Sequence, residues 1–239
     1  MKILSFILLL FLLNPLVALA GNTDFRHAQQ KSDERCLIMP AAIFATGLSI
    51  LAVDEEVRRF SQRNRLEIEN KGHLVKHSFT AALPVFAAIG YIGGNEKAQL
   101  TSRALLRGIV VNAAVTAGLK EILGRSRPNR LDDGAHEFKP FSGNRALPSG
   151  HTSHSFVVAT ILSEIYGEDY GWVTPVVYGA ATFVAYSRID GNKHWVSDLI
   201  LGAALGHVIG KWSVSKETRK ITPVVFNNGG VGLKANFRF

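Results

Sequence analysis

The chain alternates between uncharged segments and mixed segments whose apolar residues recur at helical spacing. The uncharged segments are 37–53, 78–95 and 170–187, and the mixed segments are 98–123, 150–166 and 195–213. Apolar positions that recur every three or four residues are typical of helices that bury one face. The pattern therefore predicts an all-α fold, a six-helix bundle, with the charged segment 54–71 as a candidate seventh helix.

The end of the chain follows a different period. After the turn-forming stretch Asn-Asn-Gly-Gly at 227–230, apolar and polar residues alternate from Val231 to Phe239. A period of two is typical of a half-buried strand. We therefore expect a helical domain over 37–214 and a short C-terminal β-hairpin within 215–239.

The first residues have the organisation of a secretory signal peptide. Lys2 precedes the apolar run "ILSFILLLFLL", and the small residues "ALA" follow at 18–20. This order predicts a signal peptide over 1–20, cleaved after Ala20, and a polar N-terminal segment over 21–36. The alternative is an uncleaved anchor helix. Either reading places the protein in the cell envelope, exported and facing the periplasm.

The uncharged segments leave membrane insertion open. A transmembrane helix needs about 20 apolar residues, and shorter apolar blocks are more often buried core. The three segments are about 17–18 residues long and rich in Ala and Gly. Small residues allow close helix contact in a membrane bundle and in a soluble one. Both a membrane-associated domain and an exported, core-packed domain fit this pattern.

The net charge of the chain indicates anionic partners. The formal charge is +8, and cleavage after Ala20 would remove one lysine and no acidic residue, leaving +7. A basic exported protein suits phosphate-bearing lipid surfaces. Export and the lack of a concentrated Lys/Arg helix argue against nucleic acid as a partner. Cys36 is the only cysteine, so an intramolecular disulfide is excluded.

The first stretch with candidate chemistry is "KEILGRSRP", residues 120–128. If the helix persists, Lys120 and Arg127 lie two turns apart on one face, and Pro128 ends the helix. Two cations beside apolar sequence suggest an anion between them. The alternative is a solvated basic helix end that favours the C-terminal dipole.

The second stretch is "PSGHTS", residues 148–153. Ser149 is a candidate N-cap, and Gly150 leaves the amides of the first turn open to an anion. His151 is placed to give a proton to a leaving oxygen. The alternative is an ordinary helix cap with a surface histidine.

The third stretch is "SRIDGNKHWVSD", residues 187–198. His194 and Asp198 have i, i+4 spacing, which places them on one helix face, so the carboxylate can accept the Nδ1 proton and leave Nε2 as a nucleophile. Arg188 offers a bidentate fork for phosphate oxygens. The alternative is a surface His–Asp pair. We expect Asp190 and Lys193 in a solvated turn.

Together the three stretches resemble the signature of the type 2 phosphatidic acid phosphatase family, which shares a core with vanadium haloperoxidases. The resemblance spans roughly residues 80–212, and every fixed position of the signature is present in the right order. It implies that His194 forms a phosphohistidine, Asp198 orients it and His151 is the acid and base. It also implies that the phosphate is held by Lys120, Arg127, Ser149, Gly150 and Arg188.

The resemblance implies a phosphatase without metal or other cofactor. The leading hypothesis is an envelope enzyme that hydrolyses lipid-linked phosphomonoesters or pyrophosphates. The alternatives are a broad-specificity soluble periplasmic acid phosphatase, a vanadate-dependent haloperoxidase, and a non-enzymatic envelope scaffold. The same residues serve the first two, and the chain is short for the third.

Overall fold

The computed structural model describes residues 51–68, 96–130, 137–225 and 231–237. These ranges are predominantly helical, which confirms the expected fold class. The helices are the 3-10 turn η1 (Leu51–Val53), α4 (Asp54–Arg63), α6 (Glu96–Leu123), α7 (Gly150–Tyr166), α8 (Val173–Asp190) and α9 (Val196–Thr218). The expected signal peptide (1–20), polar segment (21–36), most of segment 37–53 and all of segment 78–95 lie outside the described residues, so two of the six expected helices remain predictions.

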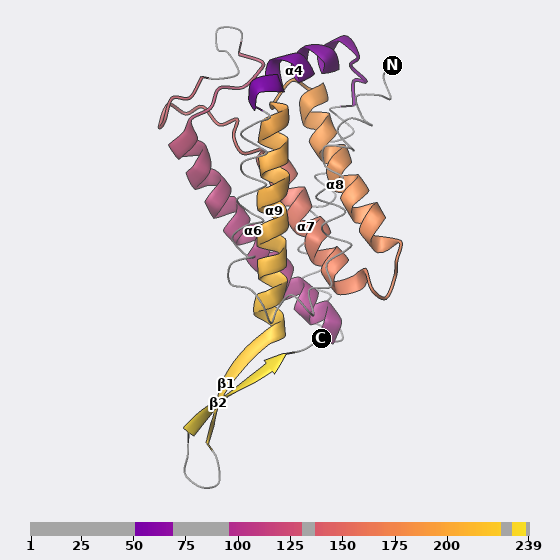
Figure 1. Cartoon of the computed structure of the whole chain (residues 1–239), viewed down its shortest axis with the longest axis vertical. Coiled ribbons are helices and arrows are strands. Elements are labelled where there is room, and N and C mark those ends of the chain that lie inside the picture. Colours follow the sequence, from indigo (N-terminus) through magenta and orange to yellow (C-terminus); the bar gives the residue numbers. More distant parts are fainter. Residues whose placement is uncertain (1–50, 69–95, 131–136, 226–230, 238–239) are drawn as a thin grey trace.

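The four long helices form a bundle in which α7 packs against the other three and α9 packs against α6 and α7 (Figure 1). One apolar cluster is buried between α7, α8 and α9, around Phe156, Tyr178 and Leu199. A second lies between α6, α7 and α9, around Leu105 and Ile161. The polypeptide direction places the C-terminal ends of α6 and α8 and the N-terminal ends of α7 and α9 at the end of the bundle that carries α4 (Figure 1).

Glycines let α9 approach α7 closely. An added Cβ at Gly206 would lie 2.2 Å from the carbonyl oxygen of Ser153, and one at Gly210 would lie 2.7 Å from the Cβ of Thr160. One turn earlier, an added Cβ at Gly202 would lie 2.8 Å from the carbonyl oxygen of Ser149. Small residues at four-residue spacing permit this backbone approach, which fixes the start of α7 beside the start of α9.

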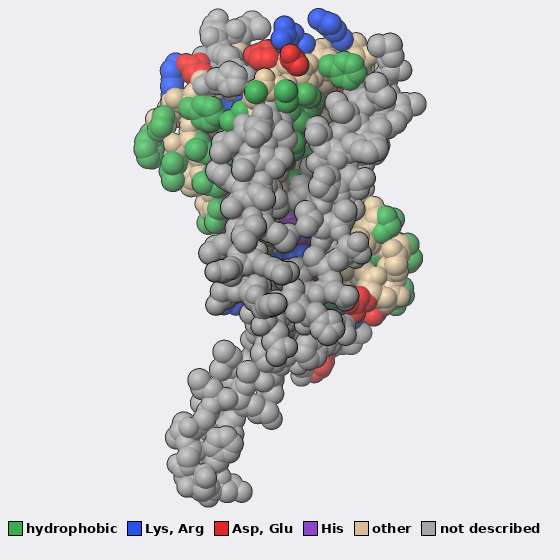
Figure 2. Space-filling view, in the orientation of Figure 1, with side chains coloured by type: hydrophobic (Ala, Val, Ile, Leu, Met, Phe, Trp, Pro, Cys, Tyr) green, Lys and Arg blue, Asp and Glu red, His purple; other side chains and the backbone are tan. Residues whose placement is uncertain are grey.

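The charged segment forms a shorter helix than expected. α4 ends at Arg63 rather than near residue 71, because Asn64 caps it and returns hydrogen bonds from its backbone and side chain to the carbonyl oxygen of Phe60. The helix buries Asp54 and Ser61 and exposes its charged outer face. Figure 2 shows acidic and basic side chains together at this end of the molecule.

The chain after α9 forms a two-stranded antiparallel sheet, where the alternating pattern predicts strands. β1 (Arg219–Val225) pairs with β2 (Val231–Phe237), and Arg219 lies opposite Phe237. Helix α9 continues past residue 214, the expected end of the helical domain, to Thr218. Figure 1 shows the hairpin extending from the end of the bundle opposite α4.

Candidate active site

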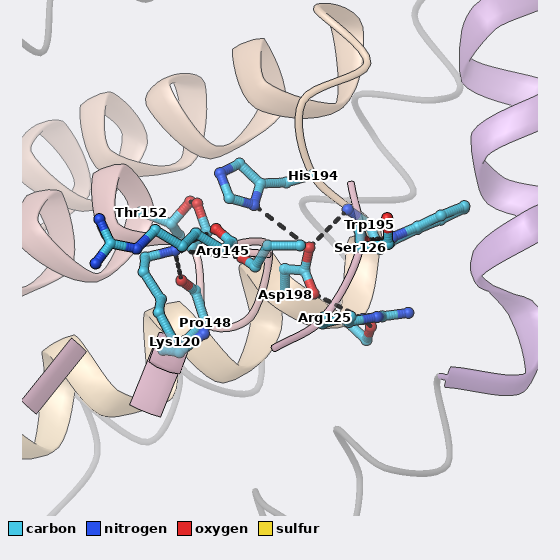
Figure 3. A network of polar contacts seen from close by, with 12 residues as sticks. Lys120, Arg125, Ser126, Arg145, Pro148, Thr152, His194, Trp195 and Asp198 are labelled. Atoms are coloured by element: carbon cyan, nitrogen blue, oxygen red, sulfur yellow. Dashed lines mark hydrogen bonds and ion pairs between the residues drawn. The ribbon is translucent and has the colours of Figure 1, made fainter. Parts of the chain in front are cut away.

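His194 and Asp198 form the centre of the candidate site (Figure 3). The Nδ1 of His194 lies 3.3 Å from Oδ2 of Asp198, and both side chains are buried. The two side chains make the expected contact, but they do not share a helix face, because α9 begins only at Val196. Asp198 lies in the first turn of α9. It accepts the backbone N–H of Trp195, the residue before the helix, at 3.0 Å, as the N3 residue of a capping box does. The cap turns the carboxylate back toward His194.

The surroundings of His194 keep its imidazole neutral. Burial lowers the pKa of His194 to about 4, while Asp198 acts in the opposite direction and Lys120 and Arg127 add to the lowering. A neutral imidazole that donates Nδ1–H to a carboxylate has a free lone pair on Nε2. The geometry is therefore that of a buried nitrogen nucleophile beside two cations.

Lys120 links the end of α6 to the start of α7. Its Nζ donates to the carbonyl oxygens of Arg145 and Pro148, each at 2.7 Å (Figure 3). An added Cβ at Gly150 would lie 3.8 Å from its Cε, so the side chain runs beside the first residue of α7. The ammonium group therefore lies near the open amides of that helix, where an anion is stabilised twice.

Electrostatic interactions also connect the cations to the His–Asp pair. Burial is the main cause that lowers the pKa of Lys120 to about 8, with Asp198 opposing it and Arg127 and Arg145 reinforcing it. Burial likewise lowers the pKa of Arg127, with the nearby Arg130 adding to the lowering and Asp198 opposing it. Lys120 and Arg127 thus act on the same carboxylate and the same imidazole.

The path from Lys120 to Arg127 differs from the expected one. Helix α6 ends at Leu123, four residues before Arg127, because Gly124 takes a left-handed φ of +54°. An added Cβ at Gly124 would also collide with the carbonyl oxygen of Lys139. Arg127 therefore reaches the site from the segment after α6, and Pro128 is not what ends the helix.

The second stretch forms the first turn of α7, as predicted. Ser149 occupies the N-cap position, but its hydroxyl makes no capping bond and instead accepts one from Thr152 at 3.0 Å. Its backbone N–H donates to the carbonyl oxygen of Asp198 at 3.0 Å. Gly150 and His151 are the first two residues of the helix, and both are partly exposed. The start of α7 is thereby joined to the start of α9.

Arg188 lies in the last turn of α8, and its side chain is almost fully buried. Its carbonyl oxygen accepts the backbone N–H of Lys193, which closes the turn that leads to His194. These contacts join Lys120, Ser149, Gly150, His194 and Asp198, and electrostatic interactions connect Arg127 to His194 and Asp198. His151 and Arg188 reach the same end of the bundle through α7 and α8 (Figure 1).

Two buried charges at the site were not anticipated as functional. Arg125, fully buried, donates from Nη1 to Oδ1 of Asp198 and from Nη2 to Oδ2 of Asp54, each at 2.6 Å. From the sequence, this arginine was interpreted only as part of a solvated basic helix end. Asp54 is the first residue of α4 and is fully buried. No local spacing signals the contact, because Asp54 lies 71 residues before Arg125.

The turn before His194 is held by α4 and by the segment that directly follows α4, rather than solvated. Asp190 is fully buried, and its carboxylate accepts the backbone N–H groups of Leu66 and Ile68 at 2.7 and 2.8 Å. Arg58 donates from Nε to the side-chain oxygen of Asn192 at 2.9 Å. The expectation of a solvated turn is therefore wrong for Asp190. A buried carboxylate here is explained by two backbone donors.

Among the described residues, no three His, Cys, Asp or Glu side chains gather in a way that could hold a metal ion. Within the same ranges, none of the helices combines the length and the apolar character needed to cross a membrane.

Comparison with known proteins identifies the family. The model of the PAP2 superfamily matches residues 101–221, slightly more than half of the chain. A lipid A 1-phosphatase of Porphyromonas gingivalis is 33% identical over 178 residues, which cover 71% of this chain and 36% of that protein. A lipid A 1-phosphatase of Rhizobium etli is 28% identical over 110 residues, which cover 46% of this chain and 45% of that protein. The chain thus spans less than half the length of these curated relatives.

A solved structure agrees with the fold. The transmembrane PAP2 type phosphatidylglycerolphosphate phosphatase from Bacillus subtilis superposes with a TM-score of 0.55 at 18% identity, covering 73% of this chain and 93% of that one. The family expected from the three stretches is confirmed: this chain belongs to the PAP2 superfamily.

Proposed function

We propose that the protein is a PAP2-type phosphatase that hydrolyses lipid-linked phosphomonoesters or pyrophosphates, with lipid A phosphates as the first class to test. The names of the relatives support this substrate class. The observation that carries the proposal is the buried His194, whose Nδ1 contacts Asp198 and whose imidazole lies under the influence of Lys120 and Arg127. A neutral imidazole surrounded by cations suits attack on a phosphate.

In the first step, Nε2 of His194 attacks phosphorus, and the bond from phosphorus to the leaving oxygen breaks. His151 donates its proton to that oxygen, so the departing group leaves as a neutral hydroxyl. Asp198 holds the Nδ1 proton and stabilises the positive charge that develops on the ring. The product of this step is a phosphohistidine.

In the second step, His151, now neutral, removes a proton from water. The water oxygen attacks phosphorus, the N–P bond breaks, and the electron pair returns to Nε2 of His194. Inorganic phosphate leaves and both histidines regain their starting protonation states. Each histidine therefore completes a cycle without an external oxidant, reductant or activating group.

The remaining residues neutralise and orient the phosphate. Lys120, Arg127 and Arg188 supply positive charge to the equatorial oxygens, and Ser149 and the Gly150 amide supply hydrogen-bond donors. Phosphoryl transfer depends mostly on positioning and on neutralising spread negative charge. Because this positive charge comes from the protein, we propose a metal-independent reaction, and we expect phosphate release to continue in EDTA.

Phosphate release from a substrate panel tests the proposal. The panel holds lipid A, phosphatidate, phosphatidylglycerolphosphate, a polyprenyl pyrophosphate and a water-soluble aryl phosphate. We expect turnover of at least one lipid by the full chain, and loss of turnover in His194→Ala. His154→Asn is the matched control, because it alters another histidine, one turn into α7, outside the proposed site. Wild-type turnover by His194→Ala refutes the mechanism.

We further propose that the protein works in the cell envelope, exported, facing the periplasm and associated with the membrane. The signal-like N-terminus and the basic charge support this location. Cell fractionation tests it. Recovery in the membrane fraction until detergent is added is the expected result. Release in the soluble periplasmic fraction, with preference for the aryl phosphate, favours the soluble acid phosphatase instead.

A further inference from the structure

A buried chain of charges extends from the candidate site into α4. Asp198 uses Oδ2 for His194 and the backbone N–H of Trp195, and Oδ1 for Arg125. Arg125 uses its second terminal nitrogen for Asp54. The ion pairs of Arg125 with Asp54 and with Asp198 join groups whose side chains are all fully buried. Arg125 is therefore shared between two carboxylates.

Ser197 closes this network. Its backbone N–H donates to Oδ1 of Asp54 at 2.9 Å, and its hydroxyl donates to Oδ2 of the same carboxylate. Arg125 also donates from Nη1 to the Ser197 hydroxyl at 2.7 Å. The two bonds from Ser197 and the bond from Nη2 of Arg125 all place donors on oxygens of Asp54, as suits an ionised carboxylate. Burial raises the pKa of Asp54, and the bonds from Arg125 and Ser197 oppose that rise.

The position of Asp54 is fixed by other contacts of α4. Arg58 reaches Asn192, and Gln62 donates from Nε2 to the carbonyl oxygen of Ile189 at 2.9 Å. The contact of Arg58 lies on the turn between α8 and α9 that carries His194, and that of Gln62 lies on the last turn of α8. Helix α4 lies outside the matched family segment, which begins at residue 101. A helix from outside that segment therefore completes the polar interior of the site.

We propose that Asp54 and Arg125 are positioning residues that hold Asp198 against His194 and leave one net negative charge beside that imidazole. Two carboxylates share one guanidinium, so this group of three side chains carries one net negative charge, and His194 lies against Oδ2 of Asp198, whereas Arg125 donates to Oδ1. Such a charge stabilises the imidazolium that develops when the Nε2–P bond forms. The inference rests on the proposed nucleophilic role of His194.

Other charged groups face His194 from the neighbouring elements. Lys120 on α6 and Arg127 on the segment after it disfavour the protonated ring, whereas Asp198 on α9 favours it. Helices α7 and α8 bring His151 and Arg188 to the same end. Cations therefore surround the ring on several sides. Asp54 offsets part of the positive charge of Arg125, so Asp198 keeps more of its negative charge to stabilise the protonated imidazole.

Asp54→Asn tests the inference, because it keeps the shape of the side chain and removes one charge. Arg125 and Asp198 then neutralise each other. We expect the acid limb of kcat/KM to move to lower pH by about one unit, and kcat at neutral pH to fall on the order of tenfold. Ser197→Ala is the matched control: it removes the hydroxyl bonds of the same network without changing charge, so its acid limb should stay in place.

The double variant Asp54→Asn/Arg125→Met separates charge from structure. It restores one net negative charge at Asp198 while the link to α4 stays broken, so the acid limb should return toward its wild-type position. Circular dichroism confirms that each variant folds, and the His194 ring titration followed by NMR gives the same shift without turnover. An unmoved limb and ring titration in Asp54→Asn overturn the inference, whereas turnover by His194→Ala overturns the proposed function.

Discussion

Adding a single methyl group where α9 meets the start of α7 provides a direct test of how the site is positioned. In Gly202→Ala the new Cβ would lie 2.8 Å from the carbonyl oxygen and 3.3 Å from the nitrogen of Ser149. Ordinary contact begins near 3.4 Å, so the backbone must withdraw by roughly 0.6 Å. The atoms in contact are backbone atoms, so no flexible side chain can move aside. The shift falls on Ser149 and Gly150.

The expected cost has two parts. Overpacking of this kind destabilises by about 1–3 kcal/mol, which lowers Tm by roughly 2–12 °C for a chain of this size. A displacement approaching 1 Å at a positioning group lowers kcat/KM by as much as about a hundredfold. Phosphate release measured well below the Tm of the variant separates the two effects. We expect kcat/KM to fall by about tenfold to a hundredfold.

Gly118→Ala is the matched control for this prediction. Gly118 lies inside α6, and among the described residues no side chain or neighbouring element lies within 4 Å of an added Cβ there. Alanine is favoured over glycine in a helix interior by about 1 kcal/mol, so Tm should rise by about 2–4 °C with unchanged turnover. Wild-type kcat/KM in Gly202→Ala would refute the view that the contact between α7 and α9 sets the geometry of the site.

Two further predictions concern the phosphate-binding cations. The pKa of Lys120 is lowered to about 8, and its charged form is the protonated one, so competitive inhibition by inorganic phosphate should weaken as pH rises through that value. Lys120→Arg should keep the inhibition constant flat to higher pH, and a flat wild-type profile would contradict the assignment. Arg188→Lys should lower kcat/KM on the order of tenfold to a hundredfold, because a point charge cannot copy the planar fork. Equal kcat/KM for wild type and Arg188→Lys would contradict the role of Arg188 in binding the phosphate.

Local sequence patterns predict the helices that flank the site. The segment 150–166 forms α7 with the expected bounds, and α6 ends at Leu123, the end of the mixed segment 98–123, rather than persisting to Pro128. Glycines lie at these two ends, Gly124 directly after α6 and Gly150 at the start of α7. The charged segment was harder to delimit, because Asn64 and the docking of residues 66–68 on Asp190 end α4. That docking is a tertiary contact with no local signal.

The site shows the same division between local and tertiary information. The spacing of His194 and Asp198 predicts their contact, although a helix cap rather than a helix face produces it. Arg127 lies near the site as predicted, but it does so because the chain turns at the left-handed Gly124, not because the helix continues. The shared position of Arg125 between Asp54 and Asp198 was inaccessible to sequence reasoning, because it depends on where α4 docks.

Trapping the phosphoenzyme tests the central claim most directly. Wild-type protein and His151→Ala are mixed with an aryl phosphate whose phenolate leaves without protonation, so that the first step does not need the acid. The samples are quenched in alkali to preserve an N–P bond and digested for mass spectrometry. We predict phosphate on the imidazole of His194, in greater amount in His151→Ala because the second step needs that base. Phosphate on another side chain, or sustained turnover with none on His194, would contradict the mechanism.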